Sequence, residues 1–161
     1  MSLPNELHIE YVNTTELNDY HRQLRTPTNL QIPKTIRLIE TCGMPQPIVV
    51  DKDNTIIIGW HLAEAARQMK LDTVPIIRAD HLDEGQVRVL RIAYDRIAEE
   101  ADWNKEEVAF EFEELLIIVP DLTITGCEID EINLRLDILP DSDPDDEMPE
   151  VTDGPALSQL G

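Results

Sequence analysis

PIVVDKDNTIIIGWHLAEAARQMKLDTVPII, residues 47–77, is the stretch that decides the fold. It opens with a short apolar run, turns at the polar residues 51–54, and returns with three consecutive isoleucines. Short β-branched runs on either side of Asp and Asn residues are typical of paired strands. Residues 47–50 and 55–58 are therefore predicted to be the two strands of a hairpin.

Gly59 ends the second of these strands, and a helical pattern follows at once over residues 60–70. The apolar face of this predicted helix consists of Leu62, Ala65, Ala66 and Met69. Residues 74–77 return to a β-branched run that predicts a third strand. Pro75 lies inside that run and, because proline cannot donate to a ladder, it predicts an edge strand or a strand start.

The N-terminal flank adds a strand and a helix to this centre. Residues 8–12 alternate between polar and apolar side chains, which predicts a first strand, and residues 13–30 are polar and predict mainly a loop. Isoleucines recur at helical spacing over residues 32–39, and Gly43 is expected to end that helix.

Three further helices are predicted on the C-terminal side. Asp83 is a suitable N-cap for a long helix that reaches about residue 101 and uses Ile97 on its apolar face. Asn104 is the expected N-cap of the next helix, and Trp103 is expected to be a core or hinge anchor between the two. A last helix is predicted over about residues 130–137.

Together these elements predict an α+β fold in which a small mixed sheet with crossover helices is followed by a helical C-terminal half. After Pro140 the chain becomes acidic and contains further prolines, a composition that cannot bury enough apolar surface to fold. The predicted organisation is a flexible N-terminus at 1–7, an α/β domain at 8–103, a helical extension packed on it at 104–139, and an acidic disordered linker or tail at 140–161.

The charge restricts the classes of function. The 161 residues include 33 acids and 13 bases, which gives a formal net charge of −20. A surface that binds duplex DNA needs clustered Lys and Arg, and the sequence shows no such cluster. The chain alone is therefore expected not to bind DNA tightly, and any association with DNA is expected to be indirect.

Other features predict a cytoplasmic protein. No apolar run approaches the ~20 residues that a membrane span requires, and the first ten residues lack the pattern of a secretory signal. Cys42 and Cys127 lie far apart in sequence and are expected to be free thiols. His8, His21 and His81 have no neighbours at ligand spacing, so no zinc site is indicated.

Several segments match a family pattern in the same order and spacing. They are Gly43 with residues 47–51, residues 55–59, residues 64–66 with 71–77, and residues 92–98 with Trp103 and Asn104. Over residues 8–138 the chain resembles the ParB-like N-terminal domain (the ParB-like nuclease domain family), which shares its fold with sulfiredoxin. Residues 93–103 and 121–132 are most similar to versions joined to bacterial and phage DNA-modification methylases.

This resemblance implies an accessory module of a DNA methylase, one that positions or regulates its partner and has no catalytic residue of its own. The implied partners are a methylase domain or another protein, and a second copy of the chain. The chain stops before any methylase motif. By itself it is therefore expected not to be a competent enzyme, although a longer parent protein would be a DNA methyltransferase.

The chemistry of the family lies at the Gly59 turn. A strand followed by a glycine and a helix N-terminus presents backbone N–H groups that favour phosphate. In ParB proteins the corresponding domain binds and hydrolyses CTP, so the resemblance implies CTP with Mg²⁺ as the ligand. The candidate phosphate-binding residues are Gly59, Trp60, His61, Arg67, Asp95 and Arg96, with Asp95 also the candidate metal ligand.

The sequence departs from the family pattern at two of its positions. Leu62 occupies the place of an arginine, and Asp95 replaces an asparagine that helps to hold nucleotide and Mg²⁺ in the family. The change Leu62→Arg is expected to strengthen phosphate binding if the pocket is otherwise intact. No cysteine is present at the turn, which argues against sulfiredoxin activity.

Each candidate residue also has a purely structural interpretation. Gly59 would then only end a strand, and Trp60 would pack over the sheet. Arg67 and Arg96 would pair with Glu64 and with Glu99–Glu100, and Asp95 would be solvated or paired with an arginine.

Three functions consequently remain open at this point. The first is the accessory module, and the alternative is a CTP-binding switch or ParB-like nuclease that uses the Gly59 turn. The third is mimicry of DNA by the acidic surface, which predicts rows of carboxylates on one face.

Overall fold

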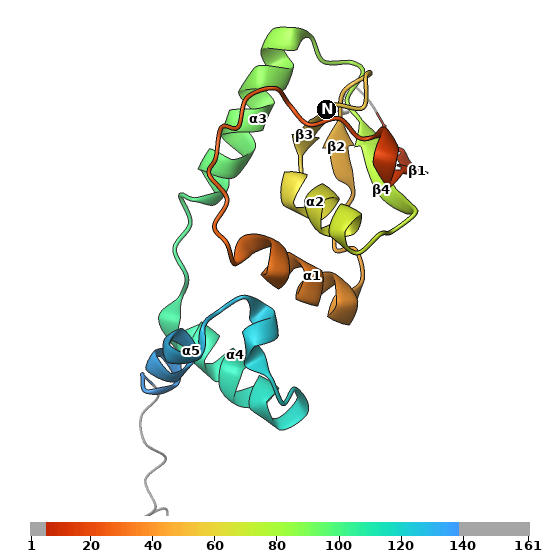
Figure 1. Ribbon diagram of the computed structural model, residues 1–161. Coiled ribbons are helices and arrows are strands. Elements are labelled where there is room, and N and C mark those ends of the chain that lie inside the picture. The colour runs from red at the N-terminus through yellow and green to blue at the C-terminus, as the bar shows by residue number, and fades with distance from the viewer. Residues whose placement is uncertain (1–5, 139–161) are drawn as a thin grey trace, which may run out of the picture.

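The computed structural model describes residues 6–138, so the predictions for residues 1–5 and 139–161 lie outside the described residues. Four short strands form one mixed sheet in the order β1-β4-β2-β3 (Figure 1). β2 and β3 form the predicted antiparallel hairpin, β4 lies parallel to β2, and β1 lies antiparallel to β4. This confirms the predicted α+β fold with a mixed sheet. The strands are β1 (Ile9–Asn13), β2 (Ile48–Val50), β3 (Ile56–Ile58) and β4 (Thr73–Arg78).

The prediction that Pro75 marks an edge or a strand start is wrong, because β4 is an interior strand. The Thr14 N–H donates to the Asp72 carbonyl at 3.0 Å. Hydrogen-bonded pairs alternate along an antiparallel ladder, so Tyr11 and Pro75 form a pair without hydrogen bonds. On its other side, β4 pairs with β2 only from Ile76 onward. Proline is tolerated here because neither neighbour requires its missing donor.

Helices cover the two faces of the sheet differently (Figure 1). α1 and α2 pack together on one face, and α3 lies on the other, where its first half packs against β3. A separate group of α4, a 3₁₀ turn η2 and α5 follows. The helical elements are η1 (Thr14–Glu16), α1 (Gln31–Cys42), α2 (Trp60–Gln68), α3 (Glu84–Ala98), α4 (Lys105–Ile118), η2 (Leu122–Thr125) and α5 (Ile129–Leu136). No helix among residues 6–138 combines the length and the apolar content needed to cross a bilayer.

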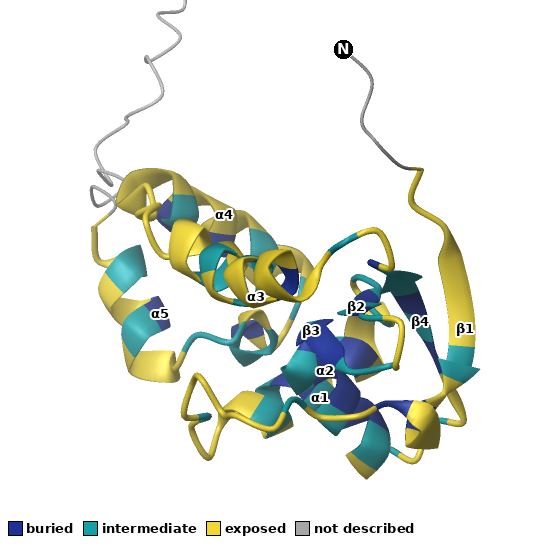
Figure 2. Cartoon of the chain, turned by 90° about the horizontal axis from the view of Figure 1, so that it is seen from above, coloured by how far each residue is buried: buried dark blue, intermediate teal, exposed yellow. Residues whose placement is uncertain are grey.

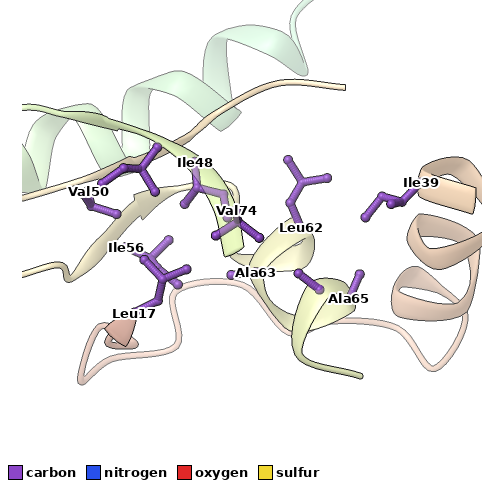
Figure 3. Close-up of a cluster of buried hydrophobic side chains, with 11 residues drawn as sticks. Leu17, Ile39, Ile48, Val50, Ile56, Leu62, Ala63, Ala65 and Val74 are labelled. Carbon is purple, nitrogen blue, oxygen red and sulfur yellow. The ribbon is translucent and has the colours of Figure 1, made fainter. Parts of the chain in front are cut away.

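The main core lies between the sheet and the α1–α2 layer (Figure 3). Leu62 of α2 is 1% exposed and points between the strands and Ile39 of α1. Complete burial of a Leu or Ile side chain contributes about 1.5–3 kcal/mol, so each buried side chain of this layer adds substantially to the stability. The fully buried large side chains are Ile48, Leu62, Ile76, Val50 and Val74.

The helical half has its own small core and is held to α1 by polar contacts. The Lys34 ammonium lies 2.6 Å from a Glu128 carboxylate oxygen and donates to the Gly126 carbonyl at 2.7 Å. Arg37 donates to Thr123 and Asp121 of the segment that contains η2. Hydrogen bonds from Thr123, and then the Arg37 guanidinium, lower the pKa of Asp121.

Two expectations about the connection between α3 and α4 are wrong. Trp103 is 74% exposed and is therefore not a core residue, and Ile97 is 70% exposed. Only the first half of α3 reaches the sheet, where Val87 is buried, so its second half and the connection after it have no core to enter. The N-caps are as predicted, since Asp83 accepts from the Gln86 N–H and Asn104 from the Glu107 N–H.

Candidate functional site

A cavity of about 1030 Å³ lies where the loop before α1 passes over β3, the start of α2 and one face of α3. We call residues 19–28 of this loop the strap, and the cavity the site pocket. In Figure 1 the strap runs in red and orange across α3 before it reaches α1. Asn18 anchors its beginning, because the Asn18 N–H donates to the Asn54 carbonyl and the Asn18 carbonyl accepts from Ile56, both at 2.9 Å.

The Gly59 turn forms one end of the site pocket. Gly59 has a φ of 93° in the left-handed region, which is the conformational reason for glycine at this position. Its carbonyl accepts the first intrahelical bonds from Leu62 and Ala63. The N–H groups of Trp60 and His61 precede these bonds, and no side chain of residues 6–138 caps α2, so the two amides are available to an anion.

The structure brings five of the six predicted site residues together. The site pocket is lined by Gly59, Trp60, His61, Asp95 and Arg96. Arg67 lies elsewhere, because it pairs with Asp19 at 3.0 Å and with Glu64 at 3.4 Å.

The surroundings of these side chains favour the structural interpretation for some of them. Trp60 packs partly buried against the main core, as the alternative interpretation expected. Arg96 pairs with Glu99 at 3.6 Å and with Glu100 at 3.4 Å, which the sequence also anticipated.

His61 and Asp95 both line the site pocket. Burial lowers the pKa of His61, and the nearby Asp95 carboxylate partly offsets that shift. Asp95 lies 3.5 Å from the Arg25 guanidinium of the strap, which also contacts Glu99 at 2.7 Å. The strap is thus held to α3 by ion pairs.

The lowered pKa of His61 predicts a pH dependence of stability. The folded state favours the neutral imidazole, so stability should begin to fall as the pH drops below the ordinary pKa of about 6.5. The loss should be complete below the lowered pKa of the folded state. Urea unfolding of wild type and His61→Gln at pH 7.5 and pH 5 measures this contribution. The wild type should lose more stability than the variant, and equal losses would contradict the assignment to His61.

Arg91 is a site residue that the sequence analysis missed. Its guanidinium lies 3.7 Å from the centre of the Tyr20 ring and donates to the Ile56 carbonyl at 3.1 Å. Burial lowers its pKa, and its Nε has no partner among the described residues. The spacing of Arg91, Asp95 and Glu99 places all three on one helical face, so this signal was present in the sequence.

The site pocket is locally basic although the chain carries a net charge of −20. Its acidic lining residues are Asp19, Asp95 and Glu99, and its basic lining residues are Arg22, Arg25, Lys34, Arg91 and Arg96. The expectation that the sequence carries no Lys/Arg cluster for duplex DNA is not tested by this pocket, whose cations alternate with acids. These cations come from the strap, α1 and α3, and folding brings them together.

The arginine position of the family turn is not a pocket position in this chain. Leu62 is 1% exposed, lies in the main core, and is absent from the lining of the site pocket. Its side chain approaches the position that a Gly59 Cβ would take, at 3.7 Å. The expectation that Leu62→Arg would strengthen phosphate binding consequently has no support in the geometry.

Within residues 6–138, no group of three or more His, Cys, Asp or Glu side chains is placed to hold a metal ion. Asp95 stays a single candidate ligand. Mg²⁺ bound to a nucleotide commonly uses one or two carboxylates together with phosphate oxygens. The residues present thus fit a metal that arrives with a phosphorylated ligand.

Three comparisons place the chain among known proteins. A scan against models of protein families finds no match. Over 81 residues the chain is 31% identical to the ParB-like nuclease domain-containing protein YnaK of Escherichia coli K12, a match that covers 50% of this chain and 93% of that protein.

Solved structures of ParB proteins share the fold. The chromosome-partitioning protein ParB of Caulobacter crescentus, crystallised in a C-terminally truncated form with CTP-γ-S, superposes with a TM-score of 0.67 at 24% identity. That match covers 83% of this chain and 81% of the other. A Pnob8-like ParB N-domain superposes with a TM-score of 0.50 at 15% identity and covers 75% of this chain and 49% of the other. Because the sequence match to YnaK extends over nearly the whole length of YnaK, the chain belongs to the ParB-like nuclease domain family.

Proposed function

We propose that the chain is a nucleotide-responsive accessory domain that binds a nucleoside triphosphate of the CTP type, with Mg²⁺, in the site pocket. The observation that carries this proposal is the gathering of five basic side chains around a cavity of about 1030 Å³ in a strongly acidic chain. Concave sites for small ligands commonly measure about 300–1,000 Å³, so the volume suits a nucleotide.

The phosphates would lie at the Gly59 turn. The Trp60 and His61 amides lie at the N-terminus of α2, where the helix dipole is positive. Arg91 lies within the same lining and offers a planar guanidinium, which suits bidentate contacts with phosphate oxygens. Arg91 thereby supplies the fixed positive charge that the turn itself lacks at Leu62.

The strap would respond to the ligand. Asp95 and Glu99 hold Arg25 in the present structure. A Mg²⁺ ion bound at Asp95 would take over part of this negative charge and release Arg25 toward the phosphates. The ion pairs between strap and α3 are thus the contacts that ligand binding would exchange.

Titration calorimetry with CTP and Mg²⁺ tests the proposal on the complete chain. We expect binding in the micromolar range that weakens as NaCl is raised, because the contacts are ionic. ATP and inorganic triphosphate, measured in parallel, separate recognition of the base from recognition of the phosphates. The absence of binding for every triphosphate with Mg²⁺ would refute the proposal.

A second candidate function is a protein-docking role, as in the accessory module of a methylase. It is favoured by large apolar side chains that α4 leaves exposed, since Ile117 is 87% and Ile118 is 76% exposed. Such a surface is typical of contact sites between proteins. Co-purification of the chain with a methylase domain, lost in an Ile117→Asp and Ile118→Asp double variant, would support this role.

A further inference from the structure

β1 is an edge strand whose outer backbone groups have no partner in the described residues. The bond from Thr14 to Asp72 fixes which residues of β1 face β4, namely Glu10 and Val12. The N–H and C=O groups of Ile9, Tyr11 and Asn13 therefore point away from the sheet. In Figure 2, β1 is almost wholly yellow and forms the outer border of the sheet.

The sheet face next to this edge is apolar and only partly covered. One row of side chains crosses all four strands in register and consists of Ile9, Ile77, Val49 and Ile58. α3 covers the β3 end of this row. At the β1 end, Ile9 is 60% and Tyr11 is 72% exposed, and a cavity of about 740 Å³ lies between β4 and α3.

The edge also lacks the devices that normally prevent strands from pairing between molecules. β1 contains no proline and no lysine, and its ladder with β4 shows no bulge. Its single charged residue, Glu10, pairs with Arg78 at 3.0 Å.

We propose that β1 pairs with β1 of a second copy of the chain, antiparallel about a two-fold axis at Tyr11, to form a continuous eight-stranded sheet. A two-fold axis places the central residue of β1 opposite the same residue of the second copy. The possible central residues are Glu10, Tyr11 and Val12. Centring at Tyr11 pairs Ile9 with Asn13 of the second copy, so all three outward residues exchange hydrogen bonds. Centring at Glu10 would set two carboxylates directly opposite each other.

The contact should be weak and should respond to salt in a characteristic way. The area buried by five paired residues and two apolar faces is at the low end for specific interfaces, where about 1,200 Å² or less is buried in total. Each copy carries a net charge of −20, so repulsion opposes assembly. NaCl should therefore strengthen the dimer, whereas it should weaken nucleotide binding in the site pocket. This inference is independent of the proposed function.

Sedimentation velocity of the full chain over a range of concentrations, at low and high NaCl, measures the assembly. We expect a reversible dimer that Tyr11→Lys weakens at least tenfold, because it sets two like charges opposite each other. Tyr11 is mostly exposed, so the fold should survive, which circular dichroism can check. Ile117→Lys makes the same charge change at an exposed residue of α4 and should leave the dimer intact.

Disulfide trapping tests the register. In a chain with Cys42→Ser and Cys127→Ser, Tyr11→Cys should give a covalent dimer, because hydrogen-bonded pairs have Cα atoms about 5.5 Å apart. Asn13→Cys should not, since the two copies of residue 13 would be about 13 Å apart. A chain that stays monomeric at all concentrations would overturn the proposal. So would a dimer that ignores Tyr11→Lys, or equal trapping at both positions.

Discussion

Leu62→Arg should destabilise the chain by about 4 kcal/mol and should not create a phosphate site. Leu62 is 1% exposed and points into the layer between the sheet and α1 (Figure 3). An arginine there either buries an unpaired charge or forces α2 away from the strands, and each alternative costs several kcal/mol. Domains of this size are stable by about 5–15 kcal/mol, so the variant should lose a large part of its stability.

Urea unfolding followed by circular dichroism measures this effect. Leu62→Met keeps the volume and the apolar character, so it should cost less than about 1.5 kcal/mol. Ile117→Arg introduces the same charge at a residue that is 87% exposed and should change stability by no more than about 0.5 kcal/mol. A Leu62→Arg chain with wild-type stability and tighter CTP binding would show that position 62 reaches the site pocket after all.

Arg91→Gln should weaken binding of CTP with Mg²⁺ about 10- to 100-fold. Hydrogen bonds to charged groups contribute about 1.5–3 kcal/mol, and every 1.4 kcal/mol changes affinity tenfold. Glutamine keeps much of the length of the side chain and removes its charge. The lost contacts with Tyr20 and the Ile56 carbonyl should also lower the stability by about 1 kcal/mol. Calorimetry is therefore to be combined with an unfolding curve for each variant.

Arg88→Gln provides the matched control on the same helix. Arg88 lies one turn before Arg91, pairs with Glu84 at 3.7 Å and is not among the lining residues of the site pocket. Its loss changes the net charge equally and should leave the affinity within about twofold of wild type. Equal losses for Arg88→Gln and Arg91→Gln would mean that only the overall charge matters. An unchanged affinity for folded Arg91→Gln would remove Arg91 from the site.

Local patterns in the sequence were sufficient to predict the order of the elements and the Gly59 turn. The hairpin around residues 51–54, the helix after Gly59 and the caps at Asp83 and Asn104 each depend on a few neighbouring residues. His61 and Asp95 came forward as site residues from the resemblance to the ParB-like family, and the structure places both in the site pocket.

Features that depend on contacts distant in sequence were not predictable in this way. The strap reaches α3 through Arg25, whose partners lie about 70 residues later, and no local pattern announces that contact. Trp103 was assigned a core or hinge position because a new helix starts at Asn104, yet within the described part of the chain its side chain is 74% exposed. Helical periodicity predicted that Leu62 lies on the apolar face of α2. The expectation of phosphate binding at this position came from the family pattern alone.

Lys34 belongs to two environments at once. It lines the site pocket, and its ammonium binds Gly126 and Glu128 of the helical half. On the proposed function, a phosphate that attracts this ammonium competes with those two oxygens. By thermodynamic reciprocity, ligand binding in the site pocket then favours release of the helical half from Lys34, and this release in turn favours ligand binding. A single lysine would in this way couple the nucleotide state of the site pocket to the position of the helical half.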